Sequence, residues 1–518
     1  MENEQKSSPT IDAPNPSRYD PVILWNHSIK TLQTGSLSKR RLLALYGLPM
    51  AWFFTNHYLA APRGFYQGIF WPLFLLITLW FFKDELRFKD PIVVLSGLGV
   101  LAGSIHSIRY AQMDMSALNF MALPLLSVFC LIVATRSHRE ITLRPFLSTL
   151  DSLLIKPLLS IFRIIPFLTN PKDQARPLST FKQQLREILI GLMIAIPIVL
   201  YLLSLLVKAD LDFAQSVNAF LNGFLQFNLG DLSSRILISF IALVYFLGVV
   251  MGIRLNQQQA AIRMNFKGNQ SAITSVIILW SVNLLYLLFT LTQLKTLYFP
   301  KEALTAMNLG IAQYARSGFF SLLLVILINL VLLWYLNSST KSSIRLNQAM
   351  KIGYFMMTFF TINLIGSSFY KMSLYEATYG FTFLRLIVKF ALIFFSLGLV
   401  LMVLFLLNKI KELINPLTLL AITMFIVLSL LNIDGIIVHK AADIYNTTGK
   451  LDLVYLSELS TDAYPALADA FHLGDTQDPN LLDLKKKYLA NKLETLTSDL
   501  YKEHPWAVSI TELQFKPY

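Results

Sequence analysis

The chain has 518 residues, of which 55% are hydrophobic and 14% are charged, and its formal net charge is +13. A soluble protein of this length would form about three domains, but so large an apolar fraction excludes that class and indicates an integral membrane protein. The positive charge does not predict nucleic-acid binding. Residues 438–518 hold 8 Lys and Arg against 12 Asp and Glu, a net charge of −4, and the basic residues upstream are spread through short loops between apolar segments.

The apolar segments predict an all-α protein, a polytopic bundle of transmembrane helices. A helix needs about 20 apolar residues to cross the hydrocarbon core. The sequence predicts about eleven spans, at 42–61, 65–82, 92–108, 116–134, 187–207, 235–253, 272–293, 317–336, 352–369, 386–407 and 417–437. A polar arm (1–41) precedes this transmembrane domain (42–437), and a small helical tail (438–518) follows it.

The distribution of basic residues predicts the orientation of the chain. Segments on the side of the N-terminus hold 24 Lys and Arg near the membrane, whereas those on the other side, without the tail, hold 10. Cytoplasmic loops are enriched in basic residues, so the N-terminal arm is expected in the cytoplasm. Eleven spans then place the tail outside, and this assignment depends on the parity of the span count.

The longest predicted cytoplasmic segment, 135–186, is not a simple loop. Between residues 146 and 168, apolar clusters alternate with charged side chains such as Lys156 and Arg163, and two prolines interrupt the pattern. This predicts two short amphipathic pieces that lie in the membrane interface and meet anionic headgroups through their basic residues.

The tail is predicted to form three helices that dock on the membrane domain. Residues 451–459 have apolar residues at helical spacing, and Thr461 or Asp462 can cap a second helix that ends near Gly474. Asp478 followed by Pro479 starts a third helix, which runs to about Glu503. Some eighty residues bury only a small core by themselves, so docking is expected.

Three clusters of polar residues lie at the predicted outer face, and further polar residues follow in the tail. The candidate ligand-binding or structural residues are Tyr314, Arg316 and Gly318; Tyr375, Glu376, Tyr379 and Arg385; Asn432 and Asp434; and, in the tail, Asp452, Tyr455 and Asp462. Arg316, Arg385, Glu376 and Asp434 could form one network beneath the tail. The favoured interpretation is a set of ion pairs that fix helix ends and dock the tail, and the alternative is a functional site, since polar residues at membrane depth often mark one.

Sequence motifs for metal, nucleotide or cofactor chemistry are absent. The sequence contains no Walker loop, HExxH, GxSxG or dinucleotide fingerprint, its histidines are scattered, and the single cysteine, Cys130, lies in an apolar run. No cofactor or metal is therefore expected. The candidates for a polar path inside the membrane are His57, His106, Asn283, Asn329 and Asn363, although lone asparagines in membrane helices more often join helices by hydrogen bonds.

Several motifs in the C-terminal half resemble a family of bacterial multi-pass membrane proteins described only as a domain of unknown function. The matching stretches are Tyr314 to Phe319, Leu374 to Arg385, Asn432 to Asp434, Leu451 to Leu456 and Ser460 to Leu467, in that order. The resemblance implies a multi-pass protein of the bacterial cytoplasmic membrane, and it implies no activity.

These observations favour a non-enzymatic role in the cell envelope, such as assembly, sensing or partner binding, because no nucleophile and base pair accompanies the motifs. One alternative is a carrier or channel, which requires a water-filled path reaching His57, His106 or Asn363. Another is a membrane enzyme acting on a lipid or glycan, with Asp434 and Glu376 as acid and base and Arg316 as an anion clamp. The expected partners are the lipid bilayer and an envelope protein, lipid or glycan at the outer face, without nucleic acid.

Overall fold

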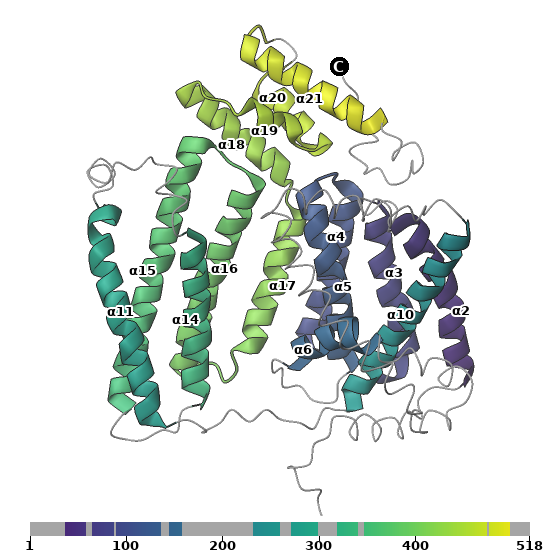
Figure 1. Cartoon of the computed structure of the whole chain (residues 1–518), viewed down its shortest axis with the longest axis horizontal. Coiled ribbons are helices and arrows are strands. Elements are labelled where there is room, and N and C mark those ends of the chain that lie inside the picture. The colour runs from purple at the N-terminus through teal and green to yellow at the C-terminus, as the bar shows by residue number, and fades with distance from the viewer. Residues whose placement is uncertain are drawn as a thin grey trace, which may run out of the picture.

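The computed structural model describes residues 37–58, 65–86, 90–135, 144–157, 232–258, 271–298, 319–339, 347–473 and 476–497. This part of the chain contains fifteen α-helices. They form two membrane bundles side by side, with a layer of short helices across one end (Figure 1). The all-α class predicted from the sequence is confirmed.

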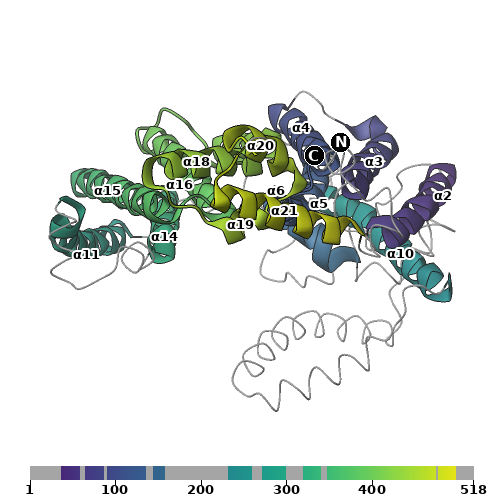
Figure 2. The same cartoon turned by 90° about the horizontal axis from the view of Figure 1, so that it is seen from above.

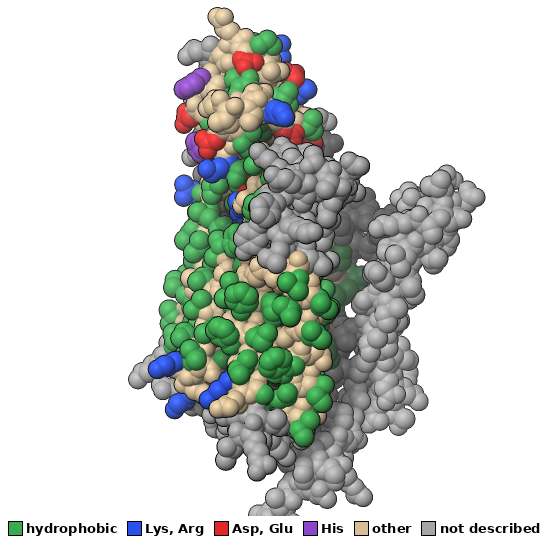
Figure 3. Space-filling view, turned by 90° about the vertical axis from the view of Figure 1, so that its left-hand side faces the viewer, with side chains coloured by type: hydrophobic (Ala, Val, Ile, Leu, Met, Phe, Trp, Pro, Cys, Tyr) green, Lys and Arg blue, Asp and Glu red, His purple; other side chains and the backbone are tan. Residues whose placement is uncertain are grey.

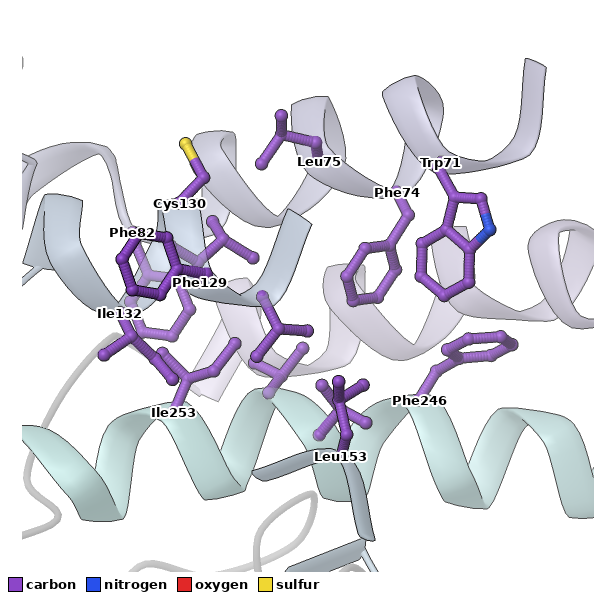
Figure 4. Packing of buried hydrophobic residues seen from close by; sticks show 14 of the residues in the cluster. Trp71, Phe74, Leu75, Phe82, Phe129, Cys130, Ile132, Leu153, Phe246 and Ile253 are labelled. Carbon is purple, nitrogen blue, oxygen red and sulfur yellow. The ribbon is translucent and has the colours of Figure 1, made fainter. Parts of the chain in front are cut away.

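The first bundle is built by the N-terminal helices around an aromatic-rich core. Its helices are α2 (Leu37–Phe53), α3 (Phe65–Phe81), α4 (Pro91–Arg109), α5 (Met113–Thr135), α6 (Arg144–Leu150) and α10 (Leu232–Gln258). Phe74 and Phe246 meet in this core, which also buries Cys130 (Figure 4). A glycine lets two neighbours approach α4 closely, because a Cβ on Gly103 would lie 2.8 Å from Leu123 of α5 and 3.1 Å from Phe425.

The second bundle has its own core and consists of α11 (Ala272–Tyr298), α14 (Phe319–Ser339), α15 (Asn347–Tyr379) and α16 (Phe383–Leu406). Helix α17 (Ile414–Leu430) lies between the bundles and packs against α4 on one side and α16 on the other. Its residue Ile422 belongs to the first core, while Leu417 packs against the second. One helix therefore joins the two bundles within the membrane layer.

The predicted last span, 417–437, is broken. Helix α17 ends at Leu430, and α18 (Ile433–Thr448) starts after a bend of 70°. The Asn432 side chain causes this restart, because its Oδ1 accepts a hydrogen bond from Gly435 N at 3.0 Å and caps the new helix. The helix ends at Gly449, whose φ of 66° suits the left-handed cap. The predicted boundary at residue 438 thus falls inside a helix.

The tail continues with helices that lie across the junction of the bundles (Figure 2). They are α19 (Leu453–Glu458), the 3-10 turn η5 (Thr461–Ala463), α20 (Tyr464–Ala470) and α21 (Pro479–Thr497). Together with α18 they form a third apolar core, which includes Leu456, Leu467 and Leu484 and also receives Met115 from α5. The three helices predicted for this region are present, and α18 is an additional one.

Six helices of the described residues are long and apolar enough to cross a membrane, or seven when α17 and α18 count as one bent span. Helices α3 and α14 are apolar but shorter, and the predicted span 187–207 lies outside the described residues. Multiple membrane-spanning helices are therefore present, but the predicted count of eleven is not confirmed.

Part of the predicted interfacial segment packs into the first bundle. Helix α6 continues into a π-helical turn, η3 (Asp151–Ile155), which contacts α10 and α5. The Tyr245 hydroxyl donates to the Leu153 carbonyl at 2.8 Å, and Lys156 is buried and pairs with Asp151 at 2.9 Å. Lys156 thus anchors this turn instead of facing headgroups. Residues 158–186 lie outside the described part.

Candidate functional site

The structure describes the side chains of eight of the twelve predicted site residues. Tyr314, Arg316 and Gly318 lie outside the described residues, and the side chain of Tyr379 is not described either. The others lie at the end of α15 (Tyr375 and Glu376), in the first turn of α16 (Arg385), at the start of α18 (Asn432 and Asp434) and in the tail (Asp452, Tyr455 and Asp462). Asp452 caps α19, since its Oδ1 accepts from Tyr455 N at 3.1 Å.

Asp434 forms the centre of the first attachment between the tail and the membrane domain. Its side chain is 3% exposed. Gln112, in the loop between α4 and α5, donates to Oδ1 at 2.6 Å, and Ser460 donates to Oδ2 through its backbone N at 3.0 Å and through its hydroxyl. A buried carboxylate needs such donors to compensate for lost hydration. Asp434 therefore links α18, the α4–α5 loop and the turn before η5.

Asp462 strengthens the same attachment from the next turn of the tail. Its Oδ2 accepts from Ala111 N at 2.7 Å and from the Ser460 hydroxyl at 2.9 Å. The backbone carbonyl of Asp462 accepts from Asn432 Nδ2 at 3.4 Å. Two buried carboxylates thus bind neighbouring residues of one membrane loop.

Helix α21 closes this cluster from above. The Tyr488 hydroxyl donates to the Ser460 carbonyl at 2.5 Å, and Asn491 Nδ2 donates to the Ser457 carbonyl at 3.3 Å. Burial of Tyr488, together with the nearby charges of Asp434 and Asp462, raises the pKa of its phenol well above the usual range. The neutral phenol is therefore part of the docked arrangement.

A second attachment joins the tail to the corner between α15 and α16. The Tyr455 hydroxyl accepts a hydrogen bond from Phe383 N at 2.8 Å, which satisfies the first amide of α16. Burial raises the pKa of Tyr455 to about 12. The chain turns at Gly380, whose φ is 77°, and the Gly380 carbonyl accepts from Arg385. The Arg385 guanidinium lies over the ring of Tyr375 at 4.2 Å.

Glu376 pairs with a residue that the predicted network did not include. Its side chain is 2% exposed and forms an ion pair with Lys389, one turn after Arg385 on α16. Asp434 is bound by Gln112 and Ser460. The described members of the predicted network therefore divide between the two attachments. The charges of both Asp434 and Arg385 act on the pKa of Tyr455.

The sequence interpretation missed the partners that complete both attachments. They are Gln112, Ser460, Lys389 and Tyr488. Ser460 lies within one of the matching stretches, and Lys389 is one of the 10 basic residues counted on the side opposite the N-terminus. Gln112 is 322 residues away from Asp434 along the chain, and no local pattern marks it. Tyr488 lies within the predicted third helix of the tail, and no local pattern marks it as a partner of Ser460.

The polar residues inside the bundles mainly join helices. Asn283 donates to the Gly353 carbonyl at 2.9 Å, Asn329 to Thr361 at 3.1 Å, and Asn363 to Thr290 at 3.4 Å. His106 Nδ1 lies 2.9 Å from the Ser429 carbonyl of α17, while its Nε2 has no hydrogen-bond partner among the described residues. The side chain of His57 is not described. Within the described part, no three His, Cys, Asp or Glu residues are grouped to hold a metal ion.

The fold and site define a multi-pass helical membrane protein with a helical tail docked over two bundles. The family model of DUF4153, a domain of unknown function, matches residues 93–470. The chain therefore belongs to this family, and the resemblance seen in its motifs is to that extent confirmed. The match covers both attachments except for Tyr488, whose helix α21 follows it. No curated protein and no solved structure matches the chain.

Proposed function

We propose that this protein is a non-enzymatic coupling protein of the bacterial cytoplasmic membrane, in which the tail holds two helix bundles in a fixed relation and responds to a partner or to a change in the membrane. The observation that carries the proposal is the double attachment. Asp434 and Asp462 bind the first bundle at the α4–α5 loop, while Tyr455 binds the second at Phe383. A rearrangement of one bundle would then be transmitted to the other through the tail.

The engagement of the two candidate acid–base residues supports a structural role. Glu376 is buried and paired with Lys389 through Oε2, while its Oε1 has no hydrogen-bond partner among the described residues; Asp434 is buried and accepts three hydrogen bonds. A general acid or base must reach a proton on its substrate. Carboxylates that hold one part of the protein to another are poorly placed for such a task.

The proposed orientation has the N-terminus in the cytoplasm and the tail outside. It is supported by the excess of basic residues in the segments on the side of the N-terminus. A tail on the outer side would meet envelope proteins, lipids or glycans.

Complementation of a deletion strain in the native host, scored by its envelope phenotype, tests the proposal. Ser460→Ala, which removes a donor shared by Asp434 and Asp462, should loosen the tail and lower complementation. Thr447→Ala is the matched control, because this exposed side chain bonds only within α18, to the carbonyls of Asp443 and Ile444. Glu376→Gln keeps size and polarity and should still complement. Loss of complementation in Glu376→Gln, with the tail still protease-resistant, would instead favour the enzyme alternative.

A carrier is the second candidate, favoured by Nε2 of buried His106, which has no hydrogen-bond partner in the part of the chain that the structure describes. Since the Ser429 carbonyl can only accept, Nδ1 carries a proton and Nε2 is left as an acceptor in the neutral ring. His106→Asn places an amide donor near the position of Nδ1 and removes Nε2. The coupling proposal expects full complementation by this variant, whereas a carrier that uses His106 would lose function.

A further inference from the structure

Helix α16 has a face that is cationic at one end and apolar along the rest. Arg385, Lys389, Ile393, Leu397 and Val400 follow one another at intervals of three or four residues and so lie on one side of the helix. The three apolar members are exposed, by 41% for Ile393, 43% for Leu397 and 57% for Val400. We call these five residues the α16 stripe.

The α16 stripe is separate from the face that packs into the second bundle. Val388, Leu392, Leu399 and Met402 are buried and lie on a different side of the helix. Only 28% of the apolar stretch of α16 is buried within the protein. The α16 stripe therefore borders the hydrocarbon region of the membrane, which suits its three apolar side chains.

The cationic end of the stripe is held in place by aromatic rings. The Arg385 guanidinium lies 4.2 Å from the ring centre of Tyr375, and Lys389 Nζ lies 5.2 Å from that of Phe381. Glu376 pairs with Lys389, so the three charged residues together carry a net charge of +1. Side chains fixed in this way lose less entropy when they bind an anion.

This end of the stripe lies near the tail-side end of the span, from which the long side chains of Arg385 and Lys389 reach headgroup depth. The candidate span in α15 ends at Ala377, and the span in α16 begins at Phe383. Lys and Arg side chains gather where the apolar surface meets the tail (Figure 3). From Lys389 to Val400 the helix rises about 16 Å, close to the thickness of one leaflet of the hydrocarbon core, about 15 Å.

We propose that the α16 stripe binds one phospholipid with an anionic headgroup in the leaflet on the tail side. Arg385 and Lys389 bind the phosphate, for which the planar guanidinium fork and the ammonium group are both suited. An acyl chain lies along Ile393, Leu397 and Val400. A free phosphate ion shares the headgroup chemistry, but it would make no use of the exposed apolar residues below.

Native mass spectrometry of the full chain tests this site. The protein is released from nanodiscs that contain equal amounts of phosphatidylglycerol and phosphatidylcholine, and the lipid retained on it is counted. Wild-type protein should be enriched in phosphatidylglycerol. Replacing Arg385→Gln or Lys389→Gln should reduce this enrichment by about fivefold per charge removed.

Arg109→Gln is the matched control, because Arg109 ends α4 and its guanidinium also lies over a tyrosine, Tyr110, at 5.2 Å. It should leave the enrichment unchanged. An equal loss in this variant would show general surface attraction and overturn the site. Retention of both lipids in equal amounts by the wild-type protein would also overturn the site. This second comparison uses the wild-type protein alone and does not depend on the folding of a variant.

Inorganic phosphate separates the two sources of the anion. Added phosphate, compared with chloride at the same ionic strength, should not displace phosphatidylglycerol from the wild-type protein. Selective displacement by phosphate would identify a soluble anion as the ligand and overturn the lipid assignment.

Discussion

The two attachments of the tail use different chemistry. At the α4–α5 loop, Asp434 is buried and bound by hydrogen bonds, and among the described residues it has no ion pair. At the α15–α16 corner the tail contributes the hydroxyl of Tyr455, and the membrane side contributes a group of charges that includes an ion pair. The first attachment is a network of buried hydrogen bonds, whereas the second lies next to a charged, partly exposed corner.

This difference indicates which attachment resists a change of conditions. Hydrogen bonds to a buried carboxylate are little screened by salt, and leaving their donors unpaired is costly. A single hydrogen bond from a backbone amide to a hydroxyl oxygen contributes much less. The tail is therefore expected to stay on the first bundle when its contact with the second is lost, which makes the corner the more readily released of the two.

The largest effect is expected from Asp434→Ala. This change leaves Gln112 Nε2 and the Ser460 amide without their buried acceptor, and the Ser460 hydroxyl keeps only its bond to Asp462. We expect a loss of about 3–5 kcal/mol in the free energy of docking, because several charge-assisted hydrogen bonds disappear at once. Limited proteolysis of the tail should show faster cleavage throughout α18 to α21.

Asp443→Ala on the same helix provides the control for this change. Asp443 is exposed and pairs with Lys440 at 3.3 Å, an interaction that contributes little at a surface. Cleavage of this variant should match that of the wild type. A similar increase in both variants would mean that general loosening of α18, and not the buried attachment, controls the tail.

Alkaline pH should weaken the contact of the tail with the α15–α16 corner. An exposed tyrosine has a pKa of about 10, whereas burial raises that of Tyr455 to about 12, opposed by the hydrogen bond from Phe383 N and by Arg385 and aided by the charges of Asp434 and Asp114. The docked state thus favours the neutral phenol, so docking is fully stable below pH 10 and weakens as the pH rises through about 12. Protease sensitivity measured against pH should rise in this window, and release at pH 9 or below would contradict the assignment.

Local patterns of the sequence predicted most helices well, because an apolar segment of fixed length is a strong signal. The last span is one exception. Its apolar character continues from α17 into Ile436 and Ile437, so hydropathy alone extends the helix through residue 437. The break depends on the Asn432 side chain capping Gly435, a local signal that hydropathy averaging overlooks.

The candidate site was predictable only on one side of each contact. Asp434, Glu376 and Arg385 could be predicted because each is a charged residue near the end of a predicted helix. Their partners were set by long-range packing, as with Gln112, or were hidden among ordinary basic residues, as with Lys389. A single sequence does not show which residues so far apart along the chain are in contact.

A smaller effect is expected from Gly380→Ala at the corner. No atom lies within 4 Å of the added Cβ, so the cost comes from the left-handed φ of 77° alone and should be about 1–2 kcal/mol. Gly366→Ala on α15 also meets open space but has a helical backbone, and it should be neutral or stabilising. Thermal unfolding of the two variants should therefore shift in different directions. A common shift would mean that backbone strain at Gly380 is unimportant.

The smallest effect, and the one that isolates the second attachment, is expected from Tyr455→Phe. The variant keeps the buried ring and removes the acceptor of Phe383 N, which should cost about 1 kcal/mol. Hydrogen exchange at the Phe383 amide should speed up about fivefold, while the amides of Ser460 and Ala111 stay protected. The control is Tyr445→Phe, whose hydroxyl bonds Asp478 within the tail and should leave Phe383 unaffected. If the Ser460 and Ala111 amides lost protection together with Phe383, the two attachments would form one cooperative unit, and the corner could not be released alone.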